Sequence, residues 1–241
     1  MCFDFHIHSN FSDGQHSLET IAEHAVETGL QAIAFSDHYF TRKTRSIKPD
    51  QLPVYLETIS KLREKYRKEL IIKSALELDM LDWILTGKEL SALPADPSID
   101  FFLCEYVTNE SLSGMPLKIF LKFRSAISKP VGLAHTDLPI AFAGIPANEL
   151  MAIFAEFNIF VELNEGYCRP GDTVPFYRHW DPYFHQALSH PVSFSAGTDM
   201  HSDLTILGAH SAYRYLESKG IRNHLIFLHE IDPDRSSLHN D

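Results

Sequence analysis

The chain has 241 residues, of which 44% are hydrophobic, and its formal net charge at pH 7 is -11. This length and apolar content are enough to bury one sizeable core, which excludes an intrinsically disordered chain. The acidic balance argues against a nucleic-acid-binding surface, because such a surface needs clustered Lys and Arg.

Strand-like apolar runs alternate with amphipathic helical segments from one end of the sequence to the other. In chain order, the pattern predicts a strand at 3–8, a helix that Ser17 caps and Gly29 ends, a strand at 31–36, a helix at 53–68, strands at 70–77 and 99–104, a helix at 115–127, a strand at 131–135, a helix at 147–157, a strand at 159–163, a helix at 182–189, a strand at 192–196 and a helix at 207–218. A last apolar run covers 225–228.

This alternation repeats about seven or eight times without a break in composition, which is typical of a parallel α/β barrel. We therefore expect one domain over 1–231, followed by a polar tail at 232–241. No apolar run reaches the roughly 18 residues that a membrane-spanning helix needs, and no segment resembles a signal peptide. The three cysteines, Cys2, Cys104 and Cys168, form no CxxC motif. These features predict a cytoplasmic protein, because a reducing compartment suits unpaired cysteines.

Residue types that bind metal ions recur where the expected strands end. They are His6, His8 and Asp13 at the first strand, Asp37 and His38 at the second, Glu77 at the third, His135 at the fifth, Glu162 and Asn164 at the sixth, and Asp199 and His201 at the seventh. The C-terminal ends of parallel barrel strands meet at one mouth, so these side chains should converge. Imidazole and carboxylate together are typical ligands of Zn²⁺, Mn²⁺ or Fe²⁺. A lone His after a strand is usually an ordinary hydrogen-bonded residue, but its repetition at separate strand ends favours a metal site.

Six segments, "DFHIHSNFSDGQHS", "GLQAIAFSDH", "ALELD", "GLAHTD", "ELNEG" and "SAGTDMHS", resemble motifs of the PHP superfamily (polymerase and histidinol phosphatase) and occur in the same order. They span roughly residues 3–205, which is nearly the whole chain. The resemblance implies a distorted (β/α)7 barrel that binds up to three divalent ions. The family it points to includes histidinol phosphatases and other phosphoesterases.

The resemblance also implies roles for particular residues. His6, His8, Glu77 and Asp199 would hold one ion, Asp13, His38 and His201 a second, and Glu77 and His135 a third, with Glu77 shared between two ions. We therefore expect two or three divalent ions, which would be Zn, Mn or Fe.

One family feature is missing, because members usually carry a histidine after the fourth strand. Here the matching stretch is "IDFFLCEYVTN", and no His occurs between His38 and His135. Alternate residues of a strand share a face, so only one of Cys104 and Glu105 can point to the mouth. We expect Glu105 to replace the histidine as a metal ligand, because a free Cys is more often a small core residue.

The segment "ELNEGYCRPG" resembles one that lies near the substrate phosphate in histidinol-phosphatase-like members. Arg169 fits the position of a phosphate-binding arginine, and its planar fork suits two phosphate oxygens. Asn164 is expected to contact the substrate as well. A solvated surface loop is the alternative for Arg169, and it is the favoured interpretation for Arg42, Lys43 and Arg45.

The prediction is a metal-dependent hydrolase, most simply a phosphoesterase that acts on a small phosphorylated metabolite through a metal-activated hydroxide. Asp199 and His201 are the candidates that assist the leaving group, and Arg169 is the candidate that neutralises the phosphoryl charge. Two alternatives stay open. One is a hydrolase of a phosphodiester or amide bond, and the other is a metal-binding module with impaired catalysis. No nucleic-acid or membrane partner is expected.

Overall fold

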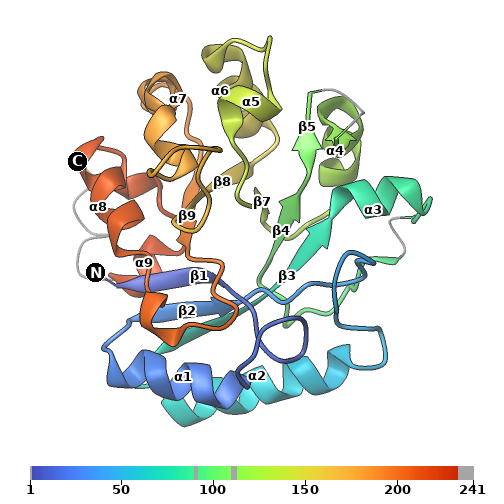
Figure 1. Ribbon diagram of the computed structural model, residues 1–241, viewed down its shortest axis with the longest axis vertical. Helices are drawn as coiled ribbons and strands as arrows, with labels where there is room; N and C mark the ends of the chain where they lie inside the picture. The colour runs from blue at the N-terminus through green and yellow to red at the C-terminus, as the bar shows by residue number, and fades with distance from the viewer. Residues whose placement is uncertain (1, 90–91, 110–112, 233–241) are drawn as a thin grey trace.

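Seven parallel strands form one sheet in the computed structural model, which describes residues 2–89, 92–109 and 113–232 (Figure 1). In sheet order the strands are β1 (Phe3–Ile7), β2 (Ala32–Phe35), β3 (Ile71–Asp79), β4 (Phe101–Glu105), β7 (Val131–Leu133), β8 (Ile159–Asn164) and β9 (Phe194–Gly197). The sheet curls until its two edge strands meet, and a parallel bridge joins Ile7 of β1 to Met200 just after β9. The prediction of a single seven-stranded α/β barrel is therefore confirmed.

Helices cover the outside of this barrel (Figure 1). They are α1 (Leu18–Glu27), α2 (Leu52–Tyr66), α3 (Met80–Leu85), α4 (Leu117–Ser125), α5 (Leu138–Ala141), α6 (Ala147–Glu156), α7 (Asp181–Ala187), α8 (His210–Ser218) and α9 (Leu228–Ile231), with the 3-10 turns η2 (Phe176–His179), η3 (Leu204–Ile206) and η4 (Arg222–His224). Helix α1 begins as predicted, because the hydroxyl of Ser17 accepts a hydrogen bond from the N–H of Thr20 at 3.2 Å. Such a cap satisfies an amide that has no partner inside the helix.

The structure differs from the predicted elements in several places. Met115 and Pro116 form β6 rather than the first turn of a helix, and β6 pairs with β5 (Val107–Thr108) outside the barrel. Helix α8 begins at His210 and not at 207, because Gly208 adopts a φ of 106° that no α-helix contains. The predicted strand at 131–135 stops at Leu133. Residues 233–241 of the predicted polar tail lie outside the described residues.

The interior below the strand ends is an aromatic layer. Phe5, Phe101, Phe160 and Phe227 come from four separate segments, and their ring centroids lie 5.7 to 5.8 Å apart in three contacts. The ring of Phe160 covers Gly132 so closely that a Cβ atom there would lie 2.0 Å from it. Phe101 and Glu105 of β4 are four positions apart, and Phe160 and Glu162 of β8 are two apart, so the residues of each pair share one face of their strand. The acidic residues near the strand ends therefore stand on a dry, apolar floor.

The barrel seam between β1 and β9 is held by a buried carboxylate. Asp4 accepts hydrogen bonds from the hydroxyl of Thr198 at 2.5 Å and from the N–H groups of Thr198 and Gly208 at 3.1 Å. Burial raises the pKa of Asp4 to about 6, although these hydrogen bonds oppose the shift. Asp4 thus positions the segment that follows β9, which carries two of the predicted metal ligands.

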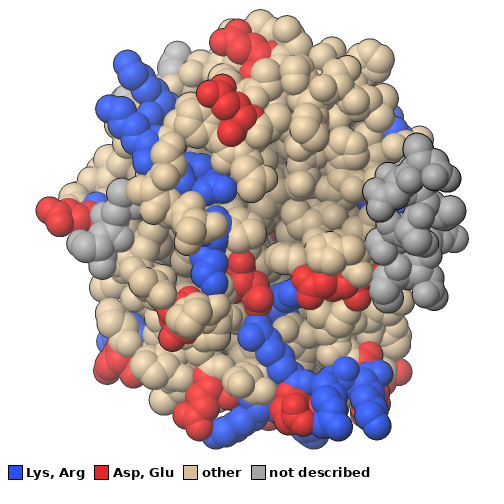
Figure 2. Space-filling model, turned by 180° about the vertical axis from the view of Figure 1, so that it is seen from behind, with Lys and Arg blue, Asp and Glu red and all other residues tan. Residues whose placement is uncertain are grey.

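Basic and acidic side chains are interspersed on the face shown in Figure 2. Within residues 2–89, 92–109 and 113–232, no helix is long and apolar enough to cross a membrane.

Candidate metal centre

Three groups of His, Asp and Glu side chains converge at the C-terminal ends of the barrel strands. Within each group, one ligand atom per residue lies within 4.8 Å of the others; the groups are His6, His8, Glu77 and Asp199, then His8, Asp13, His38 and His201, then His38, Glu77 and Glu105. They share His8, His38 and Glu77, so they form one continuous centre. The predicted residues thus meet at a single mouth, as the barrel topology requires.

The first group has the spacing of a metal site. Nε2 of His8 lies 3.0 Å from Nε2 of His6 and 2.9 Å from Oδ1 of Asp199. Oε2 of Glu77 lies 3.5 Å from Nε2 of His6 and 3.3 Å from Nε2 of His8. A tetrahedral zinc ion with bonds of about 2.0–2.1 Å holds its ligand atoms roughly 3.3–3.4 Å apart. These four residues therefore fit a divalent ion.

Unpaired buried atoms support this fit. Among the described residues, Oε2 of Glu77, Oδ1 of Asp199 and Oδ1 of Asp13 are buried and have no hydrogen-bond partner. Nδ1 of His38 and Oε1 of Glu105 share this property. An unpaired buried polar atom costs free energy unless a cation or another donor satisfies it. Five such atoms in one centre therefore indicate that positive charge lies close to it.

Glu162 fixes the ring of His6. Oε1 of Glu162 accepts a hydrogen bond from Nδ1 of His6 at 2.8 Å, and its Oε2 accepts one from the backbone N–H of His135 at 2.6 Å. Because an ionised carboxylate only accepts, the proton of His6 must sit on Nδ1, which leaves the lone pair of Nε2 pointing at the first group. The sequence placed Glu162 at a strand end, but no role was predicted for it.

The second group is built around Asp13. Oδ1 of Asp13 lies 3.3 Å from Nε2 of His201 and 3.5 Å from Nδ1 of His8, and its Oδ2 lies 3.6 Å from Nε2 of His38. Nδ1 of His201 donates to the carbonyl oxygen of Asp199 at 2.7 Å, so Nε2 of His201 faces Asp13 with its lone pair. His8 presents one ring nitrogen to each of the first two groups.

Asp37 holds the loop that carries Asp13 and is not itself part of the metal groups. It accepts hydrogen bonds from the N–H groups and the hydroxyls of Ser9 and Ser12, at 2.6 to 3.1 Å. These bonds bend the chain after β1 back toward β2. The sequence "HSNFSD" therefore needs its two serines for the position of the ligand that follows them.

The third group is looser. Nδ1 of His38 lies 3.0 Å from Oε2 of Glu77, and Nε2 of His135 lies 2.9 Å from Oε1 of Glu77. Glu105 stands farther off, with Oε1 3.9 Å from His38 Nδ1 and Oε2 3.9 Å from His135 Nε2. Glu105, and not the buried Cys104, is the residue of β4 that joins the centre. Its ligand role stays a prediction, since Oε2 of Glu105 also accepts from Nζ of Lys43 at 2.8 Å.

The charge of the centre favours cations. Burial alone would lower the pKa of His6, but the nearby carboxylates, first of all Glu162, raise it well above its usual value. Burial opposes the same shift at His8, where the adjacent carboxylates of Asp199 and Glu77 raise the pKa to about 10. Burial lowers the pKa of His38 to about 4. The carboxylates of the first group thus stabilise positive charge on its two imidazoles.

The backbone is strained at several of these positions. Phe40, Tyr106, His135 and Asp199 have positive φ values of 64°, 58°, 28° and 57°, and they follow β2, β4, β7 and β9. Such conformations cost a non-glycine residue roughly 1–3 kcal/mol and concentrate at functional sites. The sharp turn at His135 also ends β7 early, which explains why the predicted strand was too long.

Close packing at β9 requires a glycine. A Cβ atom on Gly197 would lie 2.4 Å from Cβ of His6 and 2.6 Å from Oε1 of Glu162. Both neighbours are buried, so neither has room to move aside. Gly197 on β9 therefore leaves room for His6 of β1 and Glu162 of β8 to come together.

The two predicted substrate contacts have partners within the protein. Asn164 is buried, with its amide N–H₂ donating to Glu162 at 3.1 Å and its carbonyl accepting from the N–H of Gly166 at 2.8 Å. Arg169 forms a two-pronged ion pair with Asp137, with Nε to Oδ2 at 2.6 Å and Nη2 to Oδ1 at 3.0 Å. Their substrate roles therefore stay predictions, and Asn164 is placed to orient Glu162.

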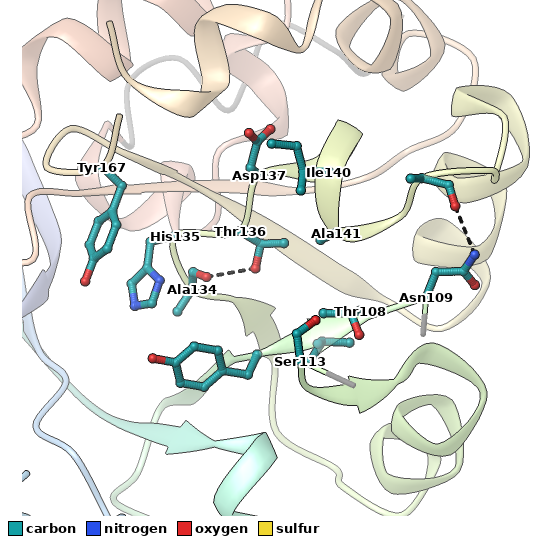
Figure 3. Close-up of a pocket in the computed structure, with 13 residues that line it drawn as sticks. Thr108, Asn109, Ser113, Ala134, His135, Thr136, Asp137, Ile140, Ala141 and Tyr167 are labelled. Atoms are coloured by element: carbon teal, nitrogen blue, oxygen red, sulfur yellow. Dashed lines mark hydrogen bonds between the residues drawn. The ribbon is translucent and has the colours of Figure 1, made fainter. Parts of the chain in front are cut away.

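A pocket of about 560 Å³ opens beside the third group (Figure 3). Tyr167 and His135 lie side by side at one end, with ring centroids 4.3 Å apart, and Asn109 lies at the other end. Asp137, the partner of Arg169, also lines the pocket. Neither Tyr167 nor the pocket was predicted. The segment "EGYCRPG" that follows β8 gave no periodic signal by which to find Tyr167.

Comparisons with known proteins agree with this fold. The family model described as PHP domain matches residues 4–166. No curated protein matches the chain. Histidinol phosphate phosphatase (HISK) from Lactococcus lactis subsp. lactis Il1403, solved with Zn, L-histidinol and phosphate, superimposes with a TM-score of 0.62 at 18% identity and covers 93% of this chain and 95% of that one. The hisK protein of Listeria monocytogenes gives a TM-score of 0.55 at 16% identity, with 83% and 95% covered. At these identities the likeness shows the fold.

Proposed function

The chain belongs to the PHP domain family, and on that premise we propose that it is a metal-dependent phosphoesterase that acts on a small phosphorylated metabolite. One observation carries the proposal. His, Asp and Glu side chains from separate strand ends place five buried, unpaired ligand atoms in one centre. A pocket of about 560 Å³, which is large enough for a small organic molecule, opens next to that centre.

The proposal gains support from the solved structures with this fold. The Lactococcus lactis protein is named a histidinol phosphate phosphatase and was solved with Zn and phosphate. Because the two chains are 18% identical, phosphate monoester hydrolysis is a proposal for the present chain. Histidinol phosphate is one candidate substrate among small phosphate monoesters. Zn²⁺, Mn²⁺ and Fe²⁺ all suit the mixed imidazole and carboxylate ligands.

The proposed roles follow from the positions of the side chains. The first group (His6, His8, Glu77 and Asp199) and the second group (His8, Asp13, His38 and His201) would each hold one divalent ion. Such ions lower the pKa of a bound water toward about 7 and neutralise phosphoryl oxygens.

The protein itself would bind, orient and shield the substrate. The hydroxyl of Tyr167 stays protonated, because burial raises its pKa, and it can donate a hydrogen bond to a phosphoryl oxygen from the pocket wall. Of the two candidates for proton movement at the leaving oxygen, His201 is 34% exposed and the Asp199 side chain is 7% exposed. Nε2 of His201 belongs to the second group and its Nδ1 donates to the carbonyl oxygen of Asp199, so His201 can move a proton only while its Nε2 is not bound to an ion. Arg169 remains the proposed phosphate contact; its partner Asp137 lines the pocket.

The test is hydrolysis by the metal-loaded enzyme. Protein purified without chelator and loaded with Zn²⁺ or Mn²⁺ should release phosphate from p-nitrophenyl phosphate and, faster, from monoesters whose alcohol fills the pocket. Faster turnover of bis(p-nitrophenyl) phosphate would point to a phosphodiesterase, and turnover of amides alone would point to an amidohydrolase. Full metal loading with no turnover of any of these would overturn the proposal and favour an impaired metal-binding module.

A further inference from the structure

A lysine ammonium occupies the edge of the third group. Lys43 lies on the loop between β2 and α2, and its Nζ lies 2.8 Å from Oε2 of Glu105 at the end of β4. The carboxylate of Glu105 is fully buried, whereas the Lys43 side chain is 43% exposed along its length. The lysine therefore enters from the surface and delivers its charge to a buried carboxylate.

Glu105 lies closer to Lys43 than to the imidazoles around the third group. In the first group the measured pairs of ligand atoms lie 2.9 to 3.5 Å apart. In the third group Oε1 of Glu105 lies 3.9 Å from Nδ1 of His38, and its Oε2 lies 3.9 Å from Nε2 of His135, which is next to the group but not a member of it. Glu105 thus stands back from the two imidazoles and within hydrogen-bond distance of Lys43.

Lys43 can balance the charge of Glu105 without a third divalent ion. Glu77 and Glu105 are both buried, and two adjacent buried carboxylates need positive charge close by. Glu77 already faces the first group, where one ion is proposed. Lys43 supplies the remaining positive charge at Glu105, and its ammonium would repel a second cation that tried to bind the same carboxylate.

We propose that the ammonium of Lys43 takes the place of the third divalent ion, so that the protein binds two ions and Glu105 serves as the partner of Lys43 rather than as a metal ligand. This inference rests on the proposed function, because it assumes that the first two groups bind metal. Nζ of Lys43 also lies 4.9 Å from the ring centroid of Tyr106, a residue that lines the pocket. The fixed cation therefore stands between the metal groups and the substrate pocket.

The experiment is a count of bound ions. Wild-type protein and the variants Lys43→Met, Lys43→Arg and Arg42→Met are saturated with Mn²⁺ at pH 8, freed of excess ion and measured by inductively coupled plasma mass spectrometry. Wild type, Lys43→Arg and Arg42→Met should hold two ions per chain. Lys43→Met should hold three, because Glu105 is then free to bind. Arg42 is the matched control, since it is the neighbouring cation, is 68% exposed and pairs with Asp82 at 2.6 Å instead.

Three ions in the wild type, or two in a folded Lys43→Met variant, would overturn the inference. An anomalous-diffraction map of wild-type crystals soaked in Mn²⁺ keeps the test independent of any variant. Two peaks, with Lys43 still bonded to Glu105, support the inference, and a third peak beside Glu105 contradicts it. Absence of bound metal in every sample would instead refute the proposed function itself.

Discussion

The carboxylate of Glu162 accepts a hydrogen bond from Nδ1 of His6 at 2.8 Å, and both side chains are fully buried. This bond sets the tautomer of His6, because the proton on Nδ1 leaves Nε2 as the only nitrogen that can bind a metal ion. Glu162 therefore governs the first metal group without touching the proposed ion.

Glu162→Gln should weaken metal binding about 10–100-fold, which is the usual cost of losing an outer partner of a ligating histidine. The carbonyl oxygen of a glutamine can still accept a hydrogen bond from His6. Its N–H₂ group would then take the place of Oε2, which now accepts from the backbone N–H of His135 at 2.6 Å, so two donors would face each other. Competition with a chromophoric chelator measures the affinity. Asn164→Asp is a useful companion, since it alters the amide donor to Glu162 and leaves the carboxylate in place. An unchanged affinity in Glu162→Gln would show that metal binding does not depend on the charge of Glu162.

His8→Ala should remove more metal than His6→Ala. His8 presents Nε2 to the first group and Nδ1 to the second, whereas His6 faces the first group alone. We expect His6→Ala to lose one ion, and His8→Ala to lose both or to bind both weakly. Elemental analysis after dialysis provides the count, with His185→Ala as a control because that histidine is exposed on α7. Equal losses in the two variants would contradict the shared role of His8.

Metal affinity should rise with pH between 6 and 8. An imidazole must lose its proton before it can bind a metal ion, and the pKa values of His6 and His8 are raised, that of His8 to about 10. The His8 ring therefore carries an extra proton over this range, and an ion that binds the first group must displace it. The release of about one proton makes the affinity climb about tenfold per pH unit. Isothermal titration calorimetry in buffers of different ionisation enthalpy counts the protons; a count near zero would contradict this.

Arg169→Ala and Asp137→Asn together separate two roles of their ion pair. If Arg169 binds the substrate phosphate, its removal should lower kcat/KM roughly tenfold to a hundredfold, the value of a charge-assisted bond of about 1.5–3 kcal/mol, with metal content unchanged. Asp137→Asn should then lower kcat/KM far less, because the guanidinium stays. Steady-state kinetics on one phosphate monoester gives both numbers. Equal losses in the two variants would mean that Arg169 only anchors the pocket wall through Asp137.

The barrel could be predicted from the sequence because its signals are local and repeated. Apolar strands alternate with amphipathic helices, and Ser17 marks the start of α1 by a bond to a residue three positions away. Helices α3 and α5 were missed because they have six and four residues, too few for a helical period to show. Met115 joins a strand only because its N–H finds the carbonyl of Tyr106, a contact that no local pattern contains.

The metal centre was predictable for a different reason. Barrel topology brings all strand ends to one mouth, so residue type and position suffice to gather His6, Glu77 and Asp199. The partners of long polar side chains depend on loop conformation instead. Lys43 and Glu105 are 62 positions apart, and Arg169 and Asp137 are 32 apart. Neither pairing affects hydrophobic periodicity. For this reason Lys43 was assigned to a solvated loop and Arg169 to phosphate binding.

Because β1 and β9 meet at the barrel seam, metal binding would stabilise the closed barrel. His6 and His8 belong to the first strand, and Asp199 and His201 follow the last, so an ion held by both sets would fasten the beginning of the barrel to its end. Backbone hydrogen bonds, such as the one from the N–H of Asp199 to the carbonyl of His6 at 2.9 Å, and the bonds of Asp4 also join β1 to the end of β9 and the segment after it. An ion at a hundred times its dissociation constant would add about 2.7 kcal/mol to the free energy of unfolding. Chelation should therefore loosen this seam first, and hydrogen exchange in the amides of β1 and β9 should report it before the rest of the barrel.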